Sequence, residues 1–403
     1  FRRDVSMKLS TRAMNMEPSA TLAISAKAKA MKREGKPVIS FGAGEPDFTS
    51  PKAALDAARE AMDRGETHYT PATGIPELKE EVAKYYERRF GLKYNSAKEI
   101  IIGSGAKPLI YEALGCLVDP GDEVMIFAPA WVSYVEQIKL CDGKPVIIDT
   151  TRSGFLPTAS LIEAEMNSRT RGMIINTPSN PIGVVYPRET LNAIADLAIK
   201  HDLWIIYDEI YERLVYDGLE HINIVAMRPE LRDRTILING ASKAFAMTGW
   251  RIGYALGPQE IMSRVGDFQG HLTSNASSIS QWATVGALRG AEEDVKRMHQ
   301  AFNERRKKIV TLLREVPNVS FVEPKGAFYV FVDIRNCLGK TYEGKTIDDD
   351  IKFCELALES KYIALVPGSA FLAPGFVRFS YANSMEEIEE GVRRFKEMVK
   401  EIK

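Results

Sequence analysis

The sequence predicts an α/β protein with a large domain, built on a mainly parallel sheet covered by helices on both faces, and a smaller α+β domain. Seven short runs of β-branched and other apolar residues alternate with helical stretches between residues 99 and 256. The runs are almost continuously apolar, which is typical of parallel strands that are buried on both faces. The length of 403 residues exceeds the usual size of one hydrophobic core and therefore favours two domains.

The runs and the stretches between them give the predicted elements of the large domain in chain order. The predicted strands are EIIIG (99–103), EVMIFA (123–128), PVIID (145–149), GMIIN (172–176), LWIIYD (203–208), TILIN (235–239) and IGYAL (252–256). Amphipathic stretches such as LIEAEMNS (161–168) and ETLNAIADLAIKH (189–201) lie between them and predict the covering helices.

After about residue 290 the pattern changes to that of an α+β domain. A long charged helix is predicted over residues 292–316, and a final amphipathic helix begins at Ser384. Short strands are predicted over GAFYVFV (326–332) and VRFSY (377–381), and another helix over 18–34. We therefore expect an N-terminal arm over residues 1–17, a small domain over 18–46 and 290–403, and a large domain over 47–289.

The composition argues against a nucleic-acid or membrane partner. The chain has 53 basic and 54 acidic residues, so its formal net charge is -1. It contains no apolar run of about eighteen residues, and its N-terminus lacks the apolar core of a signal peptide. The four cysteines form no CxxC pair and no metal-ligand pattern with histidine. This predicts free thiols in a cytoplasmic protein without a metal site.

Polar residues follow five of the predicted strands at the point where each strand ends. SGAK follows the first run, PAW the second, TPSNP the fourth, EIY the fifth and GASK the sixth. If these strands are parallel, all five clusters lie at the carboxyl edge of the sheet, where open α/β folds bind their ligands. The agreement in position is more informative than any single cluster, and it predicts a binding site at this edge.

Each cluster has a purely structural interpretation beside a functional one. The turn over residues 103–107 is either a tight strand–helix connection or a nest of N–H groups for a phosphate. Asp208 is either a helix cap or the partner of a protonated ring nitrogen. Asn180 fits an Asn-Pro turn, and Trp131 fits either core packing or stacking on a planar ligand.

Three cationic residues stand in apolar surroundings. Lys243, in NGASKAFAMTGWRIGYALG (239–257), is either a solvated lysine with a buried stem or an amine whose pKa is lowered for nucleophilic chemistry. Arg251 either pairs with an internal carboxylate or clamps a phosphate. Arg378, inside the apolar run VRFSY, calls for an anion, which is either an internal acid or a carboxylate of a substrate.

These residues belong to a set of motifs that begins at Gly44 and ends in the strand with Arg378, and the similarity around the motifs extends from about Leu9 to the C-terminus. The motifs are GEPDF (44–48), YTPATGIPELK (69–79), PAWVSY (129–134), NTPSNPIG (176–183), YDEIY (207–211), SKAFAMTGWRIG (242–253), PKGAFY (324–329) and the strand with Arg378. The set resembles the class I aminotransferases, which are pyridoxal-phosphate enzymes of fold type I. The nearest branch is that of the prokaryotic aspartate aminotransferases with a short N-terminus. The resemblance implies a mixed, mainly parallel seven-stranded sheet between helices in the large domain.

The resemblance also implies roles at the cofactor. Lys243 forms the Schiff base with the cofactor aldehyde and, once freed, moves a proton at the substrate Cα, for which it must be neutral near working pH. Asp208 keeps the pyridine nitrogen protonated, so that the ring accepts electrons. Tyr211 and Asn180 hydrogen-bond the phenolic oxygen of the ring, and Trp131 stacks on it.

A second group of residues is implied in binding the phosphate and the substrate. The remaining cofactor contacts implied are Gly105, Ala106, Lys107, Ser242, Arg251 and, from a second subunit, Tyr69. Arg378 grips the substrate α-carboxylate beside the Gly44 backbone, which orients the Cα–H bond. Trp131 and Asn180 are further substrate contacts. Lys107 is associated in this branch with a distal carboxylate, which favours aspartate and glutamate over apolar amino acids.

Together these roles predict a homodimeric enzyme that moves the α-amino group of L-aspartate to 2-oxoglutarate by a ping-pong mechanism with pyridoxal 5'-phosphate. The alternatives are an aminotransferase for aromatic, alanine-type or kynurenine substrates, a β-lyase, and a pyridoxal-phosphate-binding regulator. Two positions depart from relatives. Gly240 replaces a serine that touches the phosphate in many of them, and Glu17 replaces a basic residue of those that accept prephenate, which argues against prephenate here.

Overall fold

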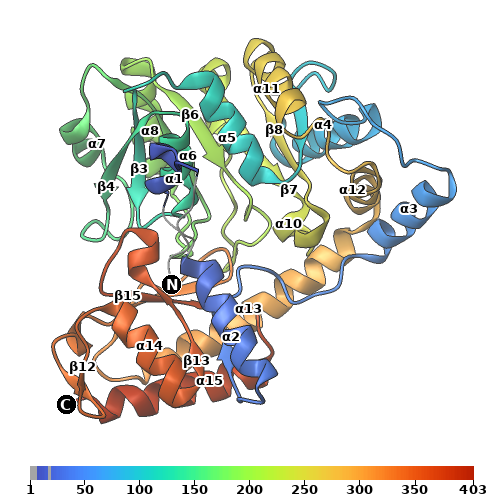
Figure 1. Ribbon diagram of the computed structural model, residues 1–403. Helices are drawn as coiled ribbons and strands as arrows, with labels where there is room; N and C mark the ends of the chain where they lie inside the picture. Colours follow the sequence, from blue (N-terminus) through green and yellow to red (C-terminus); the bar gives the residue numbers. More distant parts are fainter. Residues whose placement is uncertain (1–6, 17–19) are drawn as a thin grey trace.

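A seven-stranded sheet forms the centre of the larger part of the molecule (Figure 1). The computed structural model describes residues 7–16 and 20–403. The sheet has the strand order β2-β8-β7-β6-β5-β3-β4. Its strands are β2 (Ile100–Gly103), β3 (Glu123–Ala128), β4 (Lys144–Asp149), β5 (Thr170–Asn176), β6 (Trp204–Asp208), β7 (Thr235–Gly240) and β8 (Gly253–Leu256). Strand β8 is antiparallel to both of its neighbours and the other pairs are parallel. The prediction of a mixed, mainly parallel sheet is therefore confirmed.

Each predicted strand of the large sheet begins and ends within two residues of an observed one, and most of these strands are buried on both faces; the predicted strand 326–332 of the smaller part begins three residues before β10. In β2, Ile100 and Ile102 pack into the apolar cluster on one face of the sheet, and Ile101 packs into the cluster on the other. All three side chains are almost completely buried. Such strands need apolar residues at every position, which is why they appear as continuous runs in the sequence.

Helices cover both faces of this sheet. Helices α5 (Ala106–Leu117), α6 (Ser133–Leu140) and α11 (Gln259–Leu272) pack on one face. Helices α4 (Pro76–Phe90), α7 (Ala159–Glu165), α8 (Arg188–Lys200) and α12 (Ser278–Gly290) pack on the other. Helix α3 (Lys52–Asp63) packs closely on α12, where a Cβ at Gly286 would lie 2.3 Å from the carbonyl oxygen of Ala53. Only glycine allows this approach of two backbones.

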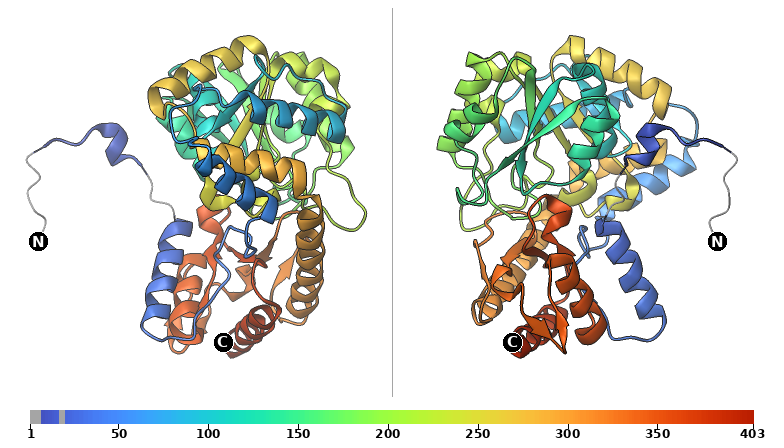
Figure 2. Two further views of the ribbon diagram at one scale, coloured as in Figure 1. Left: turned by 90° about the vertical axis from the view of Figure 1, so that its right-hand side faces the viewer. Right: turned by 60° about the vertical axis from the view of Figure 1, so that its left-hand side comes forward.

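The smaller part of the molecule lies below the larger one in Figure 2. Its antiparallel sheet has the order β14-β15-β10-β9. The strands are β14 (Val366–Pro367), β15 (Phe376–Ser380), β10 (Tyr329–Asp333) and β9 (Ser320–Phe321). Helices α13 (Glu292–Arg314), α14 (Asp350–Lys361) and α15 (Met385–Glu401) enclose a separate core with this sheet. The side chain of Ser384 caps α15, as the predicted helix start requires.

Residues near the N-terminus join the smaller part. Helix α2 (Ala20–Arg33) leads into β1 (Ile39–Ser40), which pairs in parallel with β13 (Ile363–Ala364). The short helix α1 (Thr11–Met14) stands away from the body (Figure 2), and Arg12 pairs with Asp142 over 3.0 Å. The predicted boundary between arm and small domain, and Glu17, lie outside the described residues. We keep the division into three segments as a proposal.

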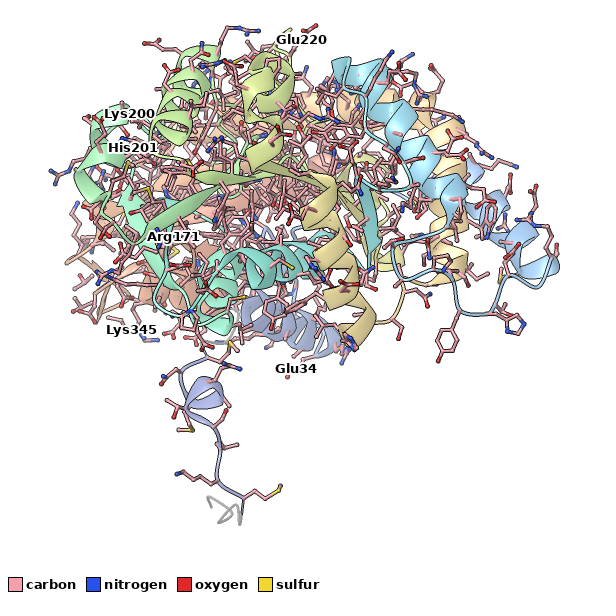
Figure 3. The ribbon with its side chains drawn as sticks, turned by 90° about the horizontal axis from the view of Figure 1, so that it is seen from above. Glu34, Arg171, Lys200, His201, Glu220 and Lys345 are labelled. Atoms are coloured by element: carbon pink, nitrogen blue, oxygen red, sulfur yellow. The ribbon has the colours of Figure 1, made fainter. Side chains whose placement is uncertain are left out.

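The outer surface carries charges of both signs, among them Arg171, Lys200, Glu220 and Lys345, which are labelled in Figure 3. Over residues 7–16 and 20–403, no helix is long and apolar enough to cross a membrane. The same residues contain no group of three His, Cys, Asp or Glu side chains arranged to hold a metal ion. All four cysteines are free thiols, as predicted.

Candidate active site

A cavity of about 610 Å³ lies between the carboxyl edge of the large sheet and the smaller part of the molecule. Because β2, β3, β5, β6 and β7 all run in the same direction, their five polar clusters meet at this edge. The predicted site residues that line the cavity are Gly44, Ala106, Lys107, Trp131, Asn180, Asp208, Tyr211, Ser242, Lys243, Arg251 and Arg378. The structure thus brings together residues that are up to 334 positions apart in the sequence, Gly44 and Arg378.

Two predicted residues do not line the cavity. Gly105 lies directly behind it, since a Cβ at this position would come within 2.3 Å of Arg251 Nη2. Tyr69 lies in the segment between α3 and α4, and its side chain is 92% exposed. Within one chain, Tyr69 therefore makes no contribution to the pocket.

Asp208 ends strand β6 and presents a buried carboxylate to the cavity. Tyr134 Oη donates to its Oδ2 over 2.6 Å, and the N–H of Ile210 donates to its Oδ1 over 3.1 Å. Burial raises the pKa of Asp208 to about 6, although the hydrogen bond from Tyr134 acts in the opposite direction. The carboxylate accepts from a residue two positions later and does not cap a helix, so the capping interpretation fails.

Lys243 lies on the short helix α10 (Ala241–Ala244), directly after β7. Its Nζ donates a short hydrogen bond to the carbonyl oxygen of Gly44. Burial lowers the pKa of Lys243 to about 8, and the nearby cations Arg378 and Arg251 lower it further, while Glu45 acts in the opposite direction. The side chain is therefore no solvated surface lysine. A substantial fraction of its amine is neutral near pH 8, as nucleophilic chemistry requires.

Arg251 meets the start of helix α5 at the Gly105 turn. It adopts a left-handed backbone conformation with φ of 57°, which is strained for a residue with a side chain. Its Nη1 donates to the carbonyl oxygen of Thr248 over 2.9 Å. No carboxylate of the described residues pairs with it, so the internal-ion-pair interpretation fails. A guanidinium beside the N-terminal N–H groups of a helix forms an anion site.

Arg378 lies in β15 and reaches the cavity from the smaller part, where its side chain is 2% exposed. Nη1 donates to Asn180 Oδ1 over 2.8 Å, and Nη2 donates to the carbonyl oxygen of Gly42 over 3.0 Å. These acceptors are neutral, and Nε has no hydrogen-bond partner among the described residues. A buried guanidinium without a carboxylate partner is suited to bind an anion that enters the cavity.

Aromatic side chains complete the walls. Tyr211 and Tyr329 share a hydrogen bond of 2.8 Å between their hydroxyl groups. The indole of Trp131 packs edge to face on Tyr134, with ring centroids 5.3 Å apart. Lys107 Nζ lies 4.7 Å from the centre of the Trp131 ring, and burial lowers the pKa of Lys107. The cavity therefore has a cation at Lys107 in addition to Arg378.

Several residues that line the cavity were not predicted as site residues, among them Tyr134, Asn176 and Tyr329. Asn176 Oδ1 accepts from the N–H of Asn180 over 2.9 Å, and its Nδ2 donates to the carbonyl oxygen of Asp208 over 3.1 Å. Its position at the end of a predicted strand was a usable signal. The two tyrosines close the motifs PAWVSY (129–134) and PKGAFY (324–329), but an aromatic residue in an apolar segment is usually a core residue, so neither was assigned a role.

The fold and the cavity define an α/β enzyme with a buried lysine, a buried carboxylate and the anion site of Arg251 at one sheet edge, and with Arg378 facing them from the smaller part. The sequence matches the family described as aminotransferase class I and II over residues 36–395, and the chain belongs to this family.

Relatives match the chain over nearly its full length. It is 45% identical to an aspartate aminotransferase of Geobacillus stearothermophilus over 96% of this chain and 98% of the relative. It is 43% identical to an aspartate/prephenate aminotransferase of Cereibacter sphaeroides over 96% of this chain and 97% of that relative. The crystal structure of the aspartate aminotransferase from Rhizobium meliloti superposes with a TM-score of 0.94 at 41% identity, covering 99% of this chain and all of that one.

Proposed function

We propose that the protein is an aspartate aminotransferase, which exchanges the α-amino group of L-aspartate for the oxo group of 2-oxoglutarate, and that it uses pyridoxal 5'-phosphate. The relatives described above support the reaction. The observation that carries the substrate class is that two further cations line the cavity besides Arg251 and Lys243. Arg378, on β15, has only neutral hydrogen-bond partners among the described residues, and Lys107 lies on helix α5. Two separate cations match the two carboxylates of aspartate.

The residues present fit the cofactor. A phosphate suits the N–H groups at the start of α5 and the guanidinium of Arg251, with Ser242 beside them in the cavity wall. The buried carboxylate of Asp208 suits a protonated ring nitrogen, and the flat side chain of Trp131 suits the ring. Gly240 leaves no serine for the phosphate, and a Cβ there would lie 2.8 Å from the carbonyl oxygen of Ile252. When bound, pyridoxal 5'-phosphate supplies an aldehyde and an electron-accepting ring.

Lys243 performs the covalent attachment and the proton transfer in this proposal. Its lowered pKa supplies neutral amine for nucleophilic attack on an aldehyde. Once released, the same amine would remove the proton from Cα of the substrate and pass it on within the same half-reaction, and the second half-reaction would run the transfer in reverse, so that Cα of the product amino acid gains a proton. The neighbouring cations Arg251 and Arg378 and the buried position both favour the neutral form.

Positioning of the substrate falls to Arg378 and the residues around it. Its guanidinium is held in a fixed orientation by Asn180 and by the carbonyl oxygen of Gly42. Tyr329 and Phe371 pack against it, with ring centroids 4.4 and 4.8 Å from its Cζ. A guanidinium that is already ordered loses little entropy on binding a carboxylate, and it fixes the direction of the Cα–H bond.

A homodimer is part of the proposal, with Tyr69 acting in the pocket of a second subunit. What supports this is the exposure of Tyr69, because a tyrosine that is 92% exposed buries most of its ring only against another molecule. Sedimentation of the active protein is expected to give a dimer. A fully active monomer would refute this part of the proposal.

The test is a substrate panel with the purified chain and pyridoxal 5'-phosphate. Formation of oxaloacetate from aspartate is expected to exceed the reactions with alanine, phenylalanine and kynurenine. Prephenate as amino acceptor belongs in the panel, because a relative carries it in its name. Ammonia and pyruvate released from cystathionine would indicate a β-lyase. No reaction with any amino acid would favour a regulator that only binds the cofactor.

A further inference from the structure

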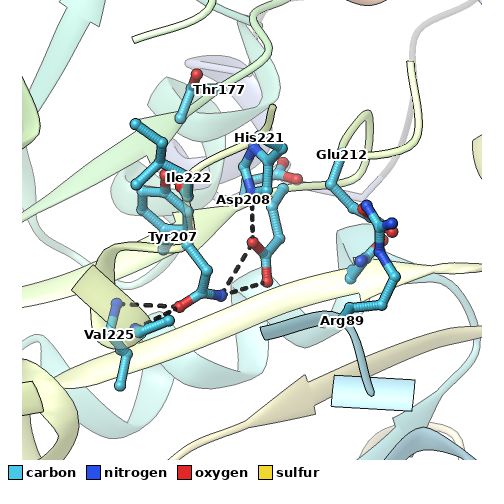
Figure 4. Close-up of polar contacts among 12 residues, drawn as sticks. Arg89, Thr177, Tyr207, Asp208, Glu212, His221, Ile222 and Val225 are labelled. Carbon is cyan, nitrogen blue, oxygen red and sulfur yellow. Dashed lines mark hydrogen bonds and ion pairs between the residues drawn. The ribbon is translucent and has the colours of Figure 1, made fainter. Parts of the chain in front are cut away.

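Glu209 follows Asp208 in the chain and is completely buried on the opposite side of the sheet. Its carboxylate accepts hydrogen bonds at both oxygens, within the group of polar contacts beside His221 in Figure 4. Tyr86 Oη donates to Oε1 over 2.8 Å, and Asn223 Nδ2 donates to the two oxygens over 3.0 and 3.1 Å. His221 Nε2 lies 2.6 Å from Oε2. A carboxylate with this many donors in the interior is held in one orientation.

The donors come from separate elements that meet behind Asp208. Tyr86 belongs to helix α4, while His221 and Asn223 belong to the segment between β6 and α9 (Ile224–Met227). Tyr207, the residue before Asp208, donates from its hydroxyl to the carbonyl oxygen of Ile222 over 2.6 Å. The side chains of the two residues that flank Asp208, Tyr207 and Glu209, are therefore hydrogen-bonded to the same segment.

The main chain of Glu209 is also fixed at both of its polar groups. Its N–H donates to the carbonyl oxygen of Ile238 over 3.0 Å, and its carbonyl oxygen accepts from the N–H of Glu212 over 2.9 Å. The rigid support on one face of the sheet thus determines where the carboxylate of Asp208 points on the other face.

Charge adds a second effect of Glu209. The negative charge of its carboxylate raises the pKa of Asp208, because two like charges so close disfavour each other. His221 contacts the carboxylate of Glu209 through Nε2, and its Nδ1 has no hydrogen-bond partner among the described residues. The other titratable side chains near Glu209 are the buried phenols of Tyr86, Tyr94, Tyr207 and Tyr254.

We propose that Glu209 is a positioning residue that fixes Asp208 in the pocket and places a second carboxylate beside it, with His221 as a hydrogen-bond partner that holds the Glu209 carboxylate. The inference rests on the proposed function, since Asp208 must be ionised to hold a protonated ring nitrogen. Glu209 itself touches neither substrate nor cofactor. Its effect is expected in how cofactor binding depends on pH.

The test uses pyridoxine 5'-phosphate, which lacks the aldehyde and therefore binds without a covalent bond to Lys243. Its dissociation constant is measured on the full chain at pH 5.5 and pH 7.5. In the wild type, binding weakens at pH 5.5 because Asp208 is increasingly protonated there. In Glu209→Gln, Asp208 ionises more readily. The ratio of the dissociation constant at pH 5.5 to that at pH 7.5 therefore falls by about twofold. In His221→Asn the Glu209 carboxylate loses a hydrogen-bond partner, so its negative charge acts more strongly on Asp208 and the ratio rises.

Glu212→Gln is the matched control. Glu212 is as deeply buried as Glu209 and three residues further on, but it is paired with Arg89 over 2.6 Å and accepts from Tyr85. This variant is expected to lower thermal stability and leave the ratio of dissociation constants as in the wild type. The control separates a general loss of packing from an effect on Asp208.

The outcomes separate the two proposals. If the wild type does not bind pyridoxine 5'-phosphate, the proposed function fails. If the wild type binds it and the ratio is unchanged in Glu209→Gln, the inference about Glu209 is overturned. If Glu209→Gln does not fold, His221→Asn decides, and an unchanged or lower ratio in that variant overturns the inference. Shifts of both variants in the same direction also overturn it.

Discussion

Tyr134 Oη donates to Asp208 Oδ2 over 2.6 Å, which joins the first turn of helix α6 to the end of strand β6. The bond stabilises the ionised carboxylate and lowers the pKa of Asp208, while burial raises it. Tyr134 in turn is held by edge-to-face packing on Trp131. Tyr134 and Trp131 thus link the packing of the cavity lining to the ionisation of Asp208.

Replacing Tyr134 with phenylalanine removes this donor and keeps the ring. The pKa of Asp208 is expected to rise by about one unit, which corresponds to the loss of a hydrogen bond to a charged group. Because Asp208 acts as an anion, activity is lost as the pH falls through its pKa, so the acid side of the pH profile of kcat/KM for aspartate moves to higher pH. Tyr216→Phe is the control, since its hydroxyl is bonded to Ala327 O outside the cavity. An unmoved profile in Tyr134→Phe would disprove the coupling.

Lys243→Ala is expected to abolish transamination, with a loss of about 10⁴-fold or more. The attachment site can be mapped directly, by reduction of the loaded wild-type enzyme with borohydride and mass analysis of its peptides. The cofactor mass is expected on the peptide with Lys243 and absent from the variant. The same mass on a peptide with another lysine, such as Lys107, would contradict the assignment. Circular dichroism checks that the variant keeps its fold.

Arg378→Lys tests the carboxylate site. Lysine keeps the charge and loses the fork of donors, so kcat/KM for aspartate is expected to fall by about 10- to 100-fold. Because every amino acid has an α-carboxylate, the loss should be equal for aspartate and alanine. Arg335→Lys is a suitable control, as Arg335 pairs with Asp333 at the surface. A loss confined to aspartate would place the distal carboxylate, and not the α-carboxylate, at Arg378.

Lys107→Gln tests substrate choice. The side chain of Lys107 lies over Trp131 in the cavity, away from the Arg378 site. Loss of its charge is expected to reduce kcat/KM for aspartate by about tenfold and to leave the value for alanine nearly unchanged. Kinetics with both amino acids give the ratio. Equal losses for both would show that Lys107 supports the pocket and does not select a dicarboxylate.

Most of the fold could be predicted from the sequence, because most strands of the large sheet are buried on both faces. Such strands appear in the sequence as continuous runs of apolar residues. It could not be derived from its residues that β8 runs antiparallel to its neighbours, since an apolar run such as IGYAL fits a parallel or an antiparallel strand equally well. It was predictable that Lys107, Asp208 and Lys243 lie at one edge of the sheet. Each of them follows a strand whose end is visible in the sequence, and these strands run in the same direction.

Other parts of the site depend on tertiary contacts and left no local signal. Arg378 has two neutral partners, Asn180 and Gly42, which come from distant parts of the chain. The structure was therefore needed to decide whether Arg378 pairs with an internal acid or binds an anion that enters the cavity. The same holds for Tyr134, whose role arises from its contact with Asp208. Glu209 was visible in the sequence beside Asp208, but only the structure shows that it points to the opposite side of the sheet.

Transfer of isotopic nitrogen is the most direct test of the whole account. The purified chain is loaded with pyridoxal 5'-phosphate and incubated with ¹⁵N-labelled L-aspartate and 2-oxoglutarate, and the products are followed by mass spectrometry. The account predicts ¹⁵N-glutamate and oxaloacetate in equal amounts, with neither product formed by Lys243→Ala. Oxaloacetate without labelled glutamate, or no reaction of aspartate while alanine or kynurenine reacts, would contradict it.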